Sequence, residues 1–183
     1  MSNRVRAIIV GILILVAYSM LLSGVTDIKW VTTLLDVISG LAVIGIAVLL
    51  FPFFKASNKG LTLGYMVMKI FEGALMIVAG ILFLSNLSFD WRGWIYNYPQ
   101  AYVFIVSAFL FYILLFKTKL VPRFISIWGL VACGMLLINN VAKLLGINSP
   151  ILDVLMVLII TNEIFLAGWL MVKGFNKSIV ISK

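Results

Sequence analysis

The stretch LTLGYMVMKIFEGALMIVAGILFLSN, from Leu61 to Asn86, decides the fold of this chain because it is apolar and long enough to cross a bilayer. It nevertheless carries Lys69 and Glu72, three residues apart. A charged side chain at the middle of a bilayer costs roughly 2.5–3.5 kcal/mol, even on the scale that gives the smallest cost. We therefore expect both side chains to find partners within the protein instead of facing lipid.

The composition of the whole chain is that of a membrane protein. Hydrophobic residues make up 64% of the 183 residues and charged residues 11%. Soluble domains contain roughly 45–50% hydrophobic residues and about 25% charged residues. No linker or low-complexity tract divides the chain. We therefore predict one membrane domain over residues 1–183, without a soluble catalytic module.

The apolar runs predict an all-α, polytopic membrane protein, a bundle of six transmembrane helices. The first run is expected to be an uncleaved helix instead of a signal peptide. The longest loop, residues 87–98, is rich in Trp and Tyr, a composition that suits the lipid headgroup layer. The predicted helices cover residues 7–23, 31–54, 61–86, 100–116, 123–147 and 150–175.

The basic residues predict the orientation. Six spans place both termini on one side, and that side carries ten Lys and Arg residues near helix ends against three on the other. The positive-inside rule therefore predicts cytoplasmic N- and C-termini in the cell (cytoplasmic or inner) membrane, and it explains the net charge of +8 without nucleic-acid binding. The ten are Arg4, Arg6, Lys55, Lys59, Lys117, Lys119, Arg123, Lys173, Lys177 and Lys183, and the three are Lys29, Arg92 and Lys143.

The residue types that are missing limit the chemistry. The chain has no histidine and one cysteine, Cys133, which excludes an intrachain disulfide, the usual zinc sites and histidine-based acid/base catalysis. The sequence also shows no metal-ligand spacing, no Gly-rich phosphate loop and no nucleophile–base pair. It therefore implies no metal and no cofactor, and it offers no catalytic residue.

Two acidic residues on different predicted helices are expected at the same depth. At a rise of about 1.5 Å per residue, Glu72 lies roughly 16 Å from the cytoplasmic end of its helix and Glu163 about 15 Å from the same side. Helical spacing gives each of them a stripe that should face the interior of the bundle. The candidate ligand or proton site near the midplane consists of Glu72, Glu163, Lys69, Tyr65 and Asn162.

This set has two interpretations. Two carboxyls that lie close together in a low dielectric cannot both ionise cheaply, so either Lys69 neutralises one of them or one of them holds a proton. Both arrangements give a group that responds to protons or cations. In the structural alternative, Lys69 and Glu72 form an ion pair, and Glu163 bonds to Asn or Tyr donors only to lock helices together.

A second polar set lies nearer the outer helix ends. Water or snorkelling relieves the cost of such residues, so they can be solvated helix ends. They can also form an outer vestibule that leads down to Glu72 and Glu163, and Asn139 is then its best member. The set consists of Asp36, Asn139, Asn140, Lys143 and Asp153.

Several short segments on different helices carry a family resemblance. They are Gly64-Tyr65 leading to Glu72-Gly73, Leu120-Val-Pro122-Arg123 running on to Trp128-Gly129, and Glu163 followed by Ala167, Trp169-Leu170 and Lys173-Gly174-Phe175. With these segments, most of the chain resembles the bacterial and archaeal membrane family called domain of unknown function 4386. The resemblance implies a compact multi-helix membrane protein and points again to Glu72 and Glu163. It implies no activity.

Three functions fit these observations. The first is a bundle that binds a small molecule or lipid, or a proton-responsive transport-type bundle, at the midplane site. The second is a structural or accessory subunit that packs against a larger membrane partner through the small residues of the second helix. The third is an intramembrane enzyme that acts on lipids with the carboxyls as acid and base. The expected partners are membrane lipids and either a second copy of the chain or a larger membrane protein.

Overall fold

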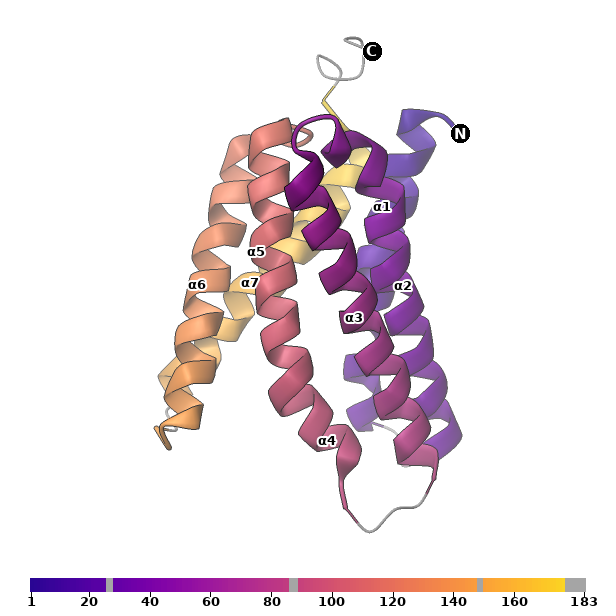
Figure 1. The fold of residues 1–183 in the computed structure, drawn as a ribbon, viewed down its shortest axis with the longest axis vertical. Coiled ribbons are helices and arrows are strands. Elements are labelled where there is room, and N and C mark those ends of the chain that lie inside the picture. Colours follow the sequence, from indigo (N-terminus) through magenta and orange to yellow (C-terminus); the bar gives the residue numbers. More distant parts are fainter. Residues whose placement is uncertain (26–27, 86–88, 148–149, 177–183) are drawn as a thin grey trace.

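The computed structural model describes residues 1–25, 28–85, 89–147 and 150–176, and most of these residues are helical. The longer helices run side by side along the length of the molecule (Figure 1). In chain order the elements are α1 (Asn3–Ala17), the 3₁₀ segment η1 (Tyr18–Val25), α2 (Lys29–Lys55), α3 (Lys59–Leu84), α4 (Trp91–Ile95), the π turn η2 (Tyr96–Gln100), α5 (Ala101–Thr118), α6 (Arg123–Leu144) and α7 (Pro150–Val172).

Local signals set the helix ends. Ser2 Oγ accepts a hydrogen bond from the Val5 amide at 3.2 Å, and Asn58 Oδ1 accepts one from the Leu61 amide at 2.9 Å, so these side chains cap α1 and α3. Lys119 adopts the left-handed conformation, with φ 54°, and this ends α5. The chain then turns before α6 begins.

The loop predicted at residues 87–98 is wrong from Trp91 onward. There the chain is helical, and α4, η2 and α5 form one continuous run, Trp91–Thr118, so the helix predicted at residues 100–116 starts earlier. Asp90 Oδ1 accepts a hydrogen bond from the Gly93 amide at 2.9 Å, which caps α4. Pro99 does not end the run, because it lies in the wider turn of η2.

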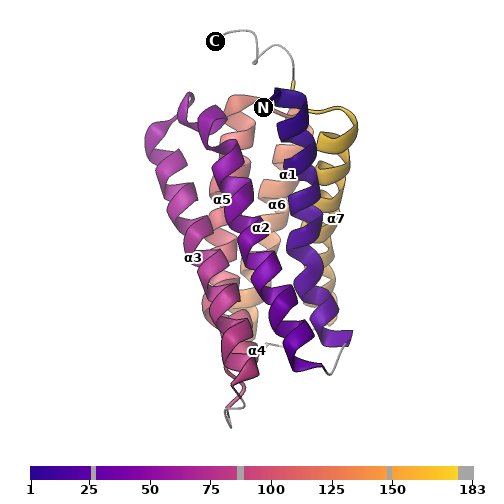
Figure 2. The same ribbon diagram turned by 90° about the vertical axis from the view of Figure 1, so that its right-hand side faces the viewer.

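Among the described residues, the long helices pack as a closed ring in the order α1, α2, α3, α5, α6 and α7, and α7 returns to α1. Arg4 joins the two ends of the ring by donating to the carbonyl oxygens of Met171 at 2.7 Å and Val172 at 3.0 Å. The start of α1 and the end of α7 therefore lie at one end of the molecule, which we call the terminus end (Figure 2). The opposite end is called the far end.

The contact between α2 and α3 is especially close at two glycines. A Cβ atom built on Gly73 would lie 2.5 Å from the carbonyl oxygen of Gly40, so the two backbones touch where neither residue has a side chain. The small residues of the second helix therefore allow a close approach, and the neighbour that uses it is α3.

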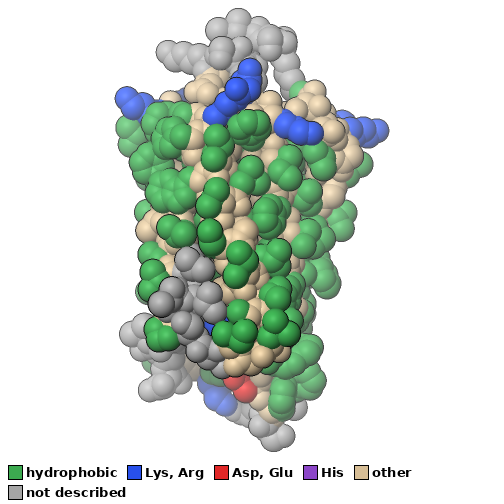
Figure 3. Space-filling model, turned by 90° about the vertical axis from the view of Figure 1, so that its left-hand side faces the viewer, with side chains coloured by type: hydrophobic (Ala, Val, Ile, Leu, Met, Phe, Trp, Pro, Cys, Tyr) green, Lys and Arg blue, Asp and Glu red, His purple; other side chains and the backbone are tan. Residues whose placement is uncertain are grey.

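The outer surface of the ring is apolar. Five helical runs are long and apolar enough to cross a membrane, namely Asn3–Leu22, Lys29–Lys55, Lys59–Leu84, Trp91–Thr118 and Arg123–Leu144, and a shorter apolar helix covers Met156–Val172. Many exposed Leu, Ile, Val and Phe side chains lie along these runs, while Lys and Arg side chains gather at the terminus end (Figure 3). This is the surface of a membrane protein.

Candidate functional site

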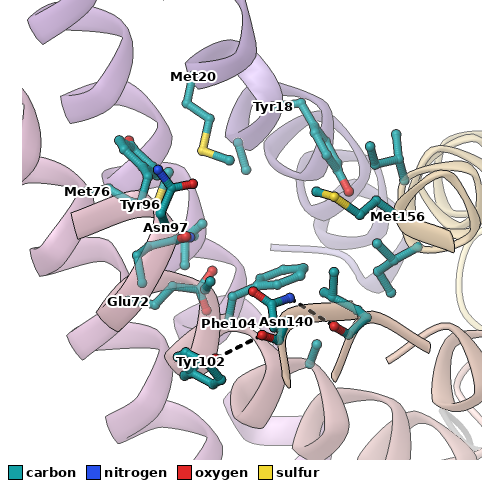
Figure 4. Close-up of a pocket in the computed structure, with 18 of the residues that line it drawn as sticks. Tyr18, Met20, Glu72, Met76, Tyr96, Asn97, Tyr102, Phe104, Asn140 and Met156 are labelled. Atoms are coloured by element: carbon teal, nitrogen blue, oxygen red, sulfur yellow. Dashed lines mark hydrogen bonds between the residues drawn. The ribbon is translucent and has the colours of Figure 1, made fainter. Parts of the chain in front are cut away.

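A cavity of about 930 Å³ extends from the far end into the middle of the ring. Side chains from α1, η1 and every later element line it, as expected for the inside of a closed ring. Figure 4 shows Tyr18 and Met156 on one side of this space, with Glu72, Tyr102 and Phe104 across it. The cavity therefore brings together residues that lie far apart in the sequence.

Tyr65 and Phe111 line the cavity on the side of the terminus end, and Phe54 packs against both; we call these three residues the aromatic floor. Tyr65 and Phe111 are stacked, with ring centroids 5.7 Å apart, and Phe54 packs edge-on against Tyr65 at 5.6 Å. Beyond this floor the ring is filled by a packed apolar core that includes Leu115 and Leu120. The cavity therefore lies towards the far end, and packed side chains fill the ring towards the terminus end.

Lys69 and Glu72 form an ion pair inside the ring. They lie on one face of α3, with Lys69 Nζ 3.1 Å from Glu72 Oε2 and 3.3 Å from Oε1. Ser107 Oγ on α5 donates to Glu72 Oε2 at 2.5 Å, and Lys69 Nζ lies 5.5 Å from the ring centroid of Phe104. Both charges are nearly inaccessible, with exposed fractions of 7% for Lys69 and 2% for Glu72. The expected pairing within the protein is therefore observed.

Glu163 lines the same cavity from α7. Tyr18 in η1 donates a hydrogen bond to Glu163 Oε2 at 2.8 Å. Glu163 is half-buried, and it lies near enough to Lys69 and Glu72 to interact electrostatically with both. The two carboxyls, brought by α3 and α7, thus line one interior space.

Two other side chains of the cavity wall have unused hydrogen-bonding groups. Asn139 on α6 is 1% exposed, and neither its amide nitrogen nor its amide oxygen has a partner among the described residues. The hydroxyl of Tyr65, which is 0% exposed, likewise has none among them. Buried polar groups are almost always hydrogen-bonded in proteins, so these atoms indicate a place that another molecule or ordered water completes.

A second ion pair anchors the far-end wall of the cavity. Asp36 on α2 is 0% exposed and accepts from Arg92 Nε at 2.7 Å, from Arg92 Nη2 at 2.9 Å and from the Tyr96 hydroxyl at 2.9 Å. Arg92 also lies over the rings of Phe83 and Tyr96. A bidentate arginine–carboxylate pair is strong and directional, so Asp36 ties α4 and η2 to α2.

Replacing Asp36 with asparagine should loosen α4 and η2. The change keeps the shape of the side chain but removes its charge, and hydrogen bonds to charged groups contribute about 1.5–3 kcal/mol each. We expect faster amide hydrogen exchange over residues 93–100, with little change in α6. Thr161→Val on α7 is the control, because Thr161 is exposed and its hydroxyl bonds to its own helix, away from the pair. Unchanged exchange in Asp36→Asn would contradict this role.

The structure gathers most, but not all, of the residues selected from the sequence. Asp36 lies behind Arg92 and Tyr96, which do line the cavity. Asn162 is buried outside it and donates to the Ile125 carbonyl oxygen at 3.1 Å. The side chain of Asp153 lies outside the described part of the chain. The residues that share the cavity are Tyr65, Lys69, Glu72, Asn139, Asn140, Lys143 and Glu163.

The sequence predicted Lys69 as the partner of Glu72, but it did not identify Ser107 and Tyr18 as hydrogen-bond donors to the two carboxyls. Ser107 is the one serine of α5 and stands among apolar residues, and that contrast is the signal that could have selected it. Tyr18 stands at the end of the first apolar run, where it resembles an interface residue. The π turn η2 contributes Tyr96 and Asn97 to the wall, although its composition predicts a headgroup loop.

Comparison with protein-family models matches residues 26–90 and 84–174 to a family described as a domain of unknown function, DUF4386. The chain belongs to this family. The resemblance noted in the sequence is thereby confirmed. In this DUF4386 protein the first matched segment carries Lys69 and Glu72, and the second carries Ser107, Asn139 and Glu163. Neither the comparison with curated proteins nor that with solved structures gave a match.

Proposed function

We propose that this DUF4386 protein crosses the cytoplasmic membrane six times with both termini in the cytoplasm. We further propose that it is a transport-type or receptor-type bundle that binds a small amphipathic molecule in its cavity. Support for the orientation comes from the concentration of Lys and Arg at the terminus end, as the positive-inside rule requires for a cytoplasmic face. The far end, where the cavity begins, would then face outward.

The observation that carries the proposal is Asn139, a buried amide with neither polar atom satisfied, in the wall of a cavity of about 930 Å³. This volume lies within the range of about 300–1,000 Å³ typical of small-molecule sites. Such sites are mostly apolar and aromatic with a few well-placed polar groups. The cavity has this character, because Met, Phe and Tyr side chains surround Lys69, Glu72 and Glu163.

The contacts of the candidate residues favour binding over the other two functions. Both oxygens of Glu72 are engaged by Lys69 and Ser107, so this carboxylate has little capacity to act as a general base. Gly40, part of the small-residue face of the second helix, packs against α3 within the chain. That contact uses the surface that an accessory subunit would offer to a partner.

The proposal predicts that the purified protein retains a small molecule that depends on Asn139. Native mass spectrometry of the wild type, released from mild detergent, should show the protein with a bound species. Asn139→Leu keeps the size of the side chain but removes its donor and acceptor. Because an unmade buried hydrogen bond costs about 1–3 kcal/mol, the affinity should fall about tenfold or more and bound occupancy should fall with it.

The matched control is Thr161→Val on α7. Thr161 is exposed, and its hydroxyl bonds to its own helix at Val157, so the change removes a polar group without touching the cavity. Occupancy should stay at the wild-type level. A wild-type protein that carries no bound species, or equal occupancy in Asn139→Leu, would refute the proposed function.

A further inference from the structure

The charges in the inner part of the cavity do not balance. Lys69 supplies one positive charge, whereas Glu72 and Glu163 can supply two negative charges. The other basic groups of the wall lie towards the far end. Arg92 is bonded to Asp36, and Lys143 is exposed at the end of α6, where solvent screens it. Among the described residues, no second basic side chain in the inner part of the cavity is therefore left to balance the charge of Glu163.

A carboxylate in this position needs a proton or a cation, because an uncompensated charge in a low dielectric is costly. The tyrosine and cysteine side chains near Glu163 are neutral when protonated, so they supply no positive charge to balance it. The titratable groups near enough to interact electrostatically with Glu163 are Tyr18 from η1, Tyr65, Lys69 and Glu72 from α3, Tyr112 from α5 and Cys133 from α6. Glu163 is also the more exposed of the two residues, since it is half-buried whereas Glu72 is 2% exposed.

The rest of the cavity suits a cation with an apolar body. The ring of Phe104 already interacts with the Lys69 ammonium at 5.5 Å, and Phe111 presents a further aromatic group in the same space. Met20, Met76 and Met156, from three different elements, line it as well (Figure 4). Methionine side chains adapt to irregular apolar shapes, and aromatic faces attract cations. The unsatisfied hydroxyl of Tyr65 is independent evidence that the cavity wall lacks a partner.

We propose that the ligand is a lipophilic organic monocation whose positive centre pairs with Glu163 and whose apolar body lies among the aromatic and methionine side chains. Binding releases the proton that Glu163 holds in the empty cavity, so one positive charge enters as one leaves. This inference rests on the proposed binding function and adds the charge of the ligand to it. Protons and the cation therefore compete for the same carboxyl.

The test uses two ions of matching shape and opposite charge and a smaller neutral molecule with three phenyl groups, with the whole chain in lipid nanodiscs. They are the cation tetraphenylphosphonium, the anion tetraphenylborate and the neutral triphenylphosphine oxide. Binding is measured by equilibrium dialysis and corrected with empty nanodiscs, because all three dissolve in lipid. We expect the cation to bind roughly tenfold or more tightly than the anion, and acidification to weaken the cation alone.

Glu163→Gln should weaken cation binding by about tenfold or more, because it removes the charge and keeps the shape. Glu163→Asp should stay within about threefold of the wild type. If Glu163→Gln fails to fold, the cation-to-anion ratio of the wild type decides: a ratio above threefold supports the proposal, and a smaller one overturns it. Equal cation binding in folded Glu163→Gln also overturns it.

The neutral molecule separates this inference from the proposed function. If triphenylphosphine oxide binds in the wild type and weakens in Asn139→Leu while the cation shows no preference, the cavity is a small-molecule site and only the assigned charge is wrong. If none of the three molecules binds above the level of empty nanodiscs, the inference is overturned, and native mass spectrometry then decides the proposed function separately. If Glu163 takes up and releases a proton but no cation competes with that proton, the cation site is overturned and Glu163 is a proton site only.

Discussion

Replacing Lys69 with methionine is expected to lower the free energy of unfolding by about 3–5 kcal/mol, the usual cost of removing one partner from a buried ion pair. Methionine fills nearly the same space but carries no charge. It would leave the Glu72 carboxylate, which is 2% exposed, without its counter-charge. Ser107 donates a single hydrogen bond to this carboxylate and cannot replace that charge. Unfolding by titration with a denaturing detergent measures the loss.

The double variant Lys69→Met, Glu72→Gln should recover most of that loss. Removing both charges leaves no uncompensated ion, and replacement of a buried pair by neutral groups is often close to neutral in stability. Lys117→Met is the control, because Lys117 is an exposed lysine in the last turn of α5. If Lys69→Met unfolds like Lys117→Met, the ion pair does not stabilise the fold.

Gly73→Leu should be the most damaging substitution on the contact between α2 and α3. Its Cβ would lie 2.5 Å from the Gly40 carbonyl oxygen and 2.7 Å from Ile44, so the two backbones must separate. Overpacking of this kind typically costs about 1–3 kcal/mol, and the involvement of a backbone oxygen places the expected loss of unfolding free energy at about 3 kcal/mol. The same detergent titration reports it.

Gly168→Leu provides the matched control for this contact. A Cβ at Gly168 in α7 meets nothing within 4 Å, and leucine is a better helix former than glycine. This variant should unfold at or above the wild-type denaturant concentration. Because the propensity change is the same in both variants, a loss confined to Gly73→Leu is assigned to the helix contact. Equal behaviour of the two variants would show that α2 and α3 tolerate separation.

The sequence predicted the parts of the fold and site that depend on one helix at a time. Long apolar runs and a helical stripe are properties of single segments, so the all-helical fold was predictable. The stripe through Tyr65, Lys69, Glu72, Met76 and Gly80 on α3 is buried along its whole length. Asn139 was likewise selected from a single helix, as the best member of the outer vestibule.

The errors concern contacts between segments. Asn162 is next to Glu163 in sequence, but successive residues on a helix point about 100° apart, so it faces Ile125 on α6 instead of the cavity. Asp36 and Arg92 were assigned to different regions, because no spacing rule links residues on separate elements. The helical state of residues 91–100 depends on that link and on the Asp90 cap, whereas the local composition resembles a headgroup loop.

The joint between α1 and α7 has a consequence for biogenesis. Ribosomes deliver the helices in order, and the ring gains its last wall only when α7 arrives and Arg4 can reach the carbonyl oxygens of Met171 and Val172. Under the proposed topology, Lys69 and Glu72 enter the membrane while a gap is still open beside them. Their pairing within α3 would then protect the unfinished protein, because the two charges are matched before the ring closes.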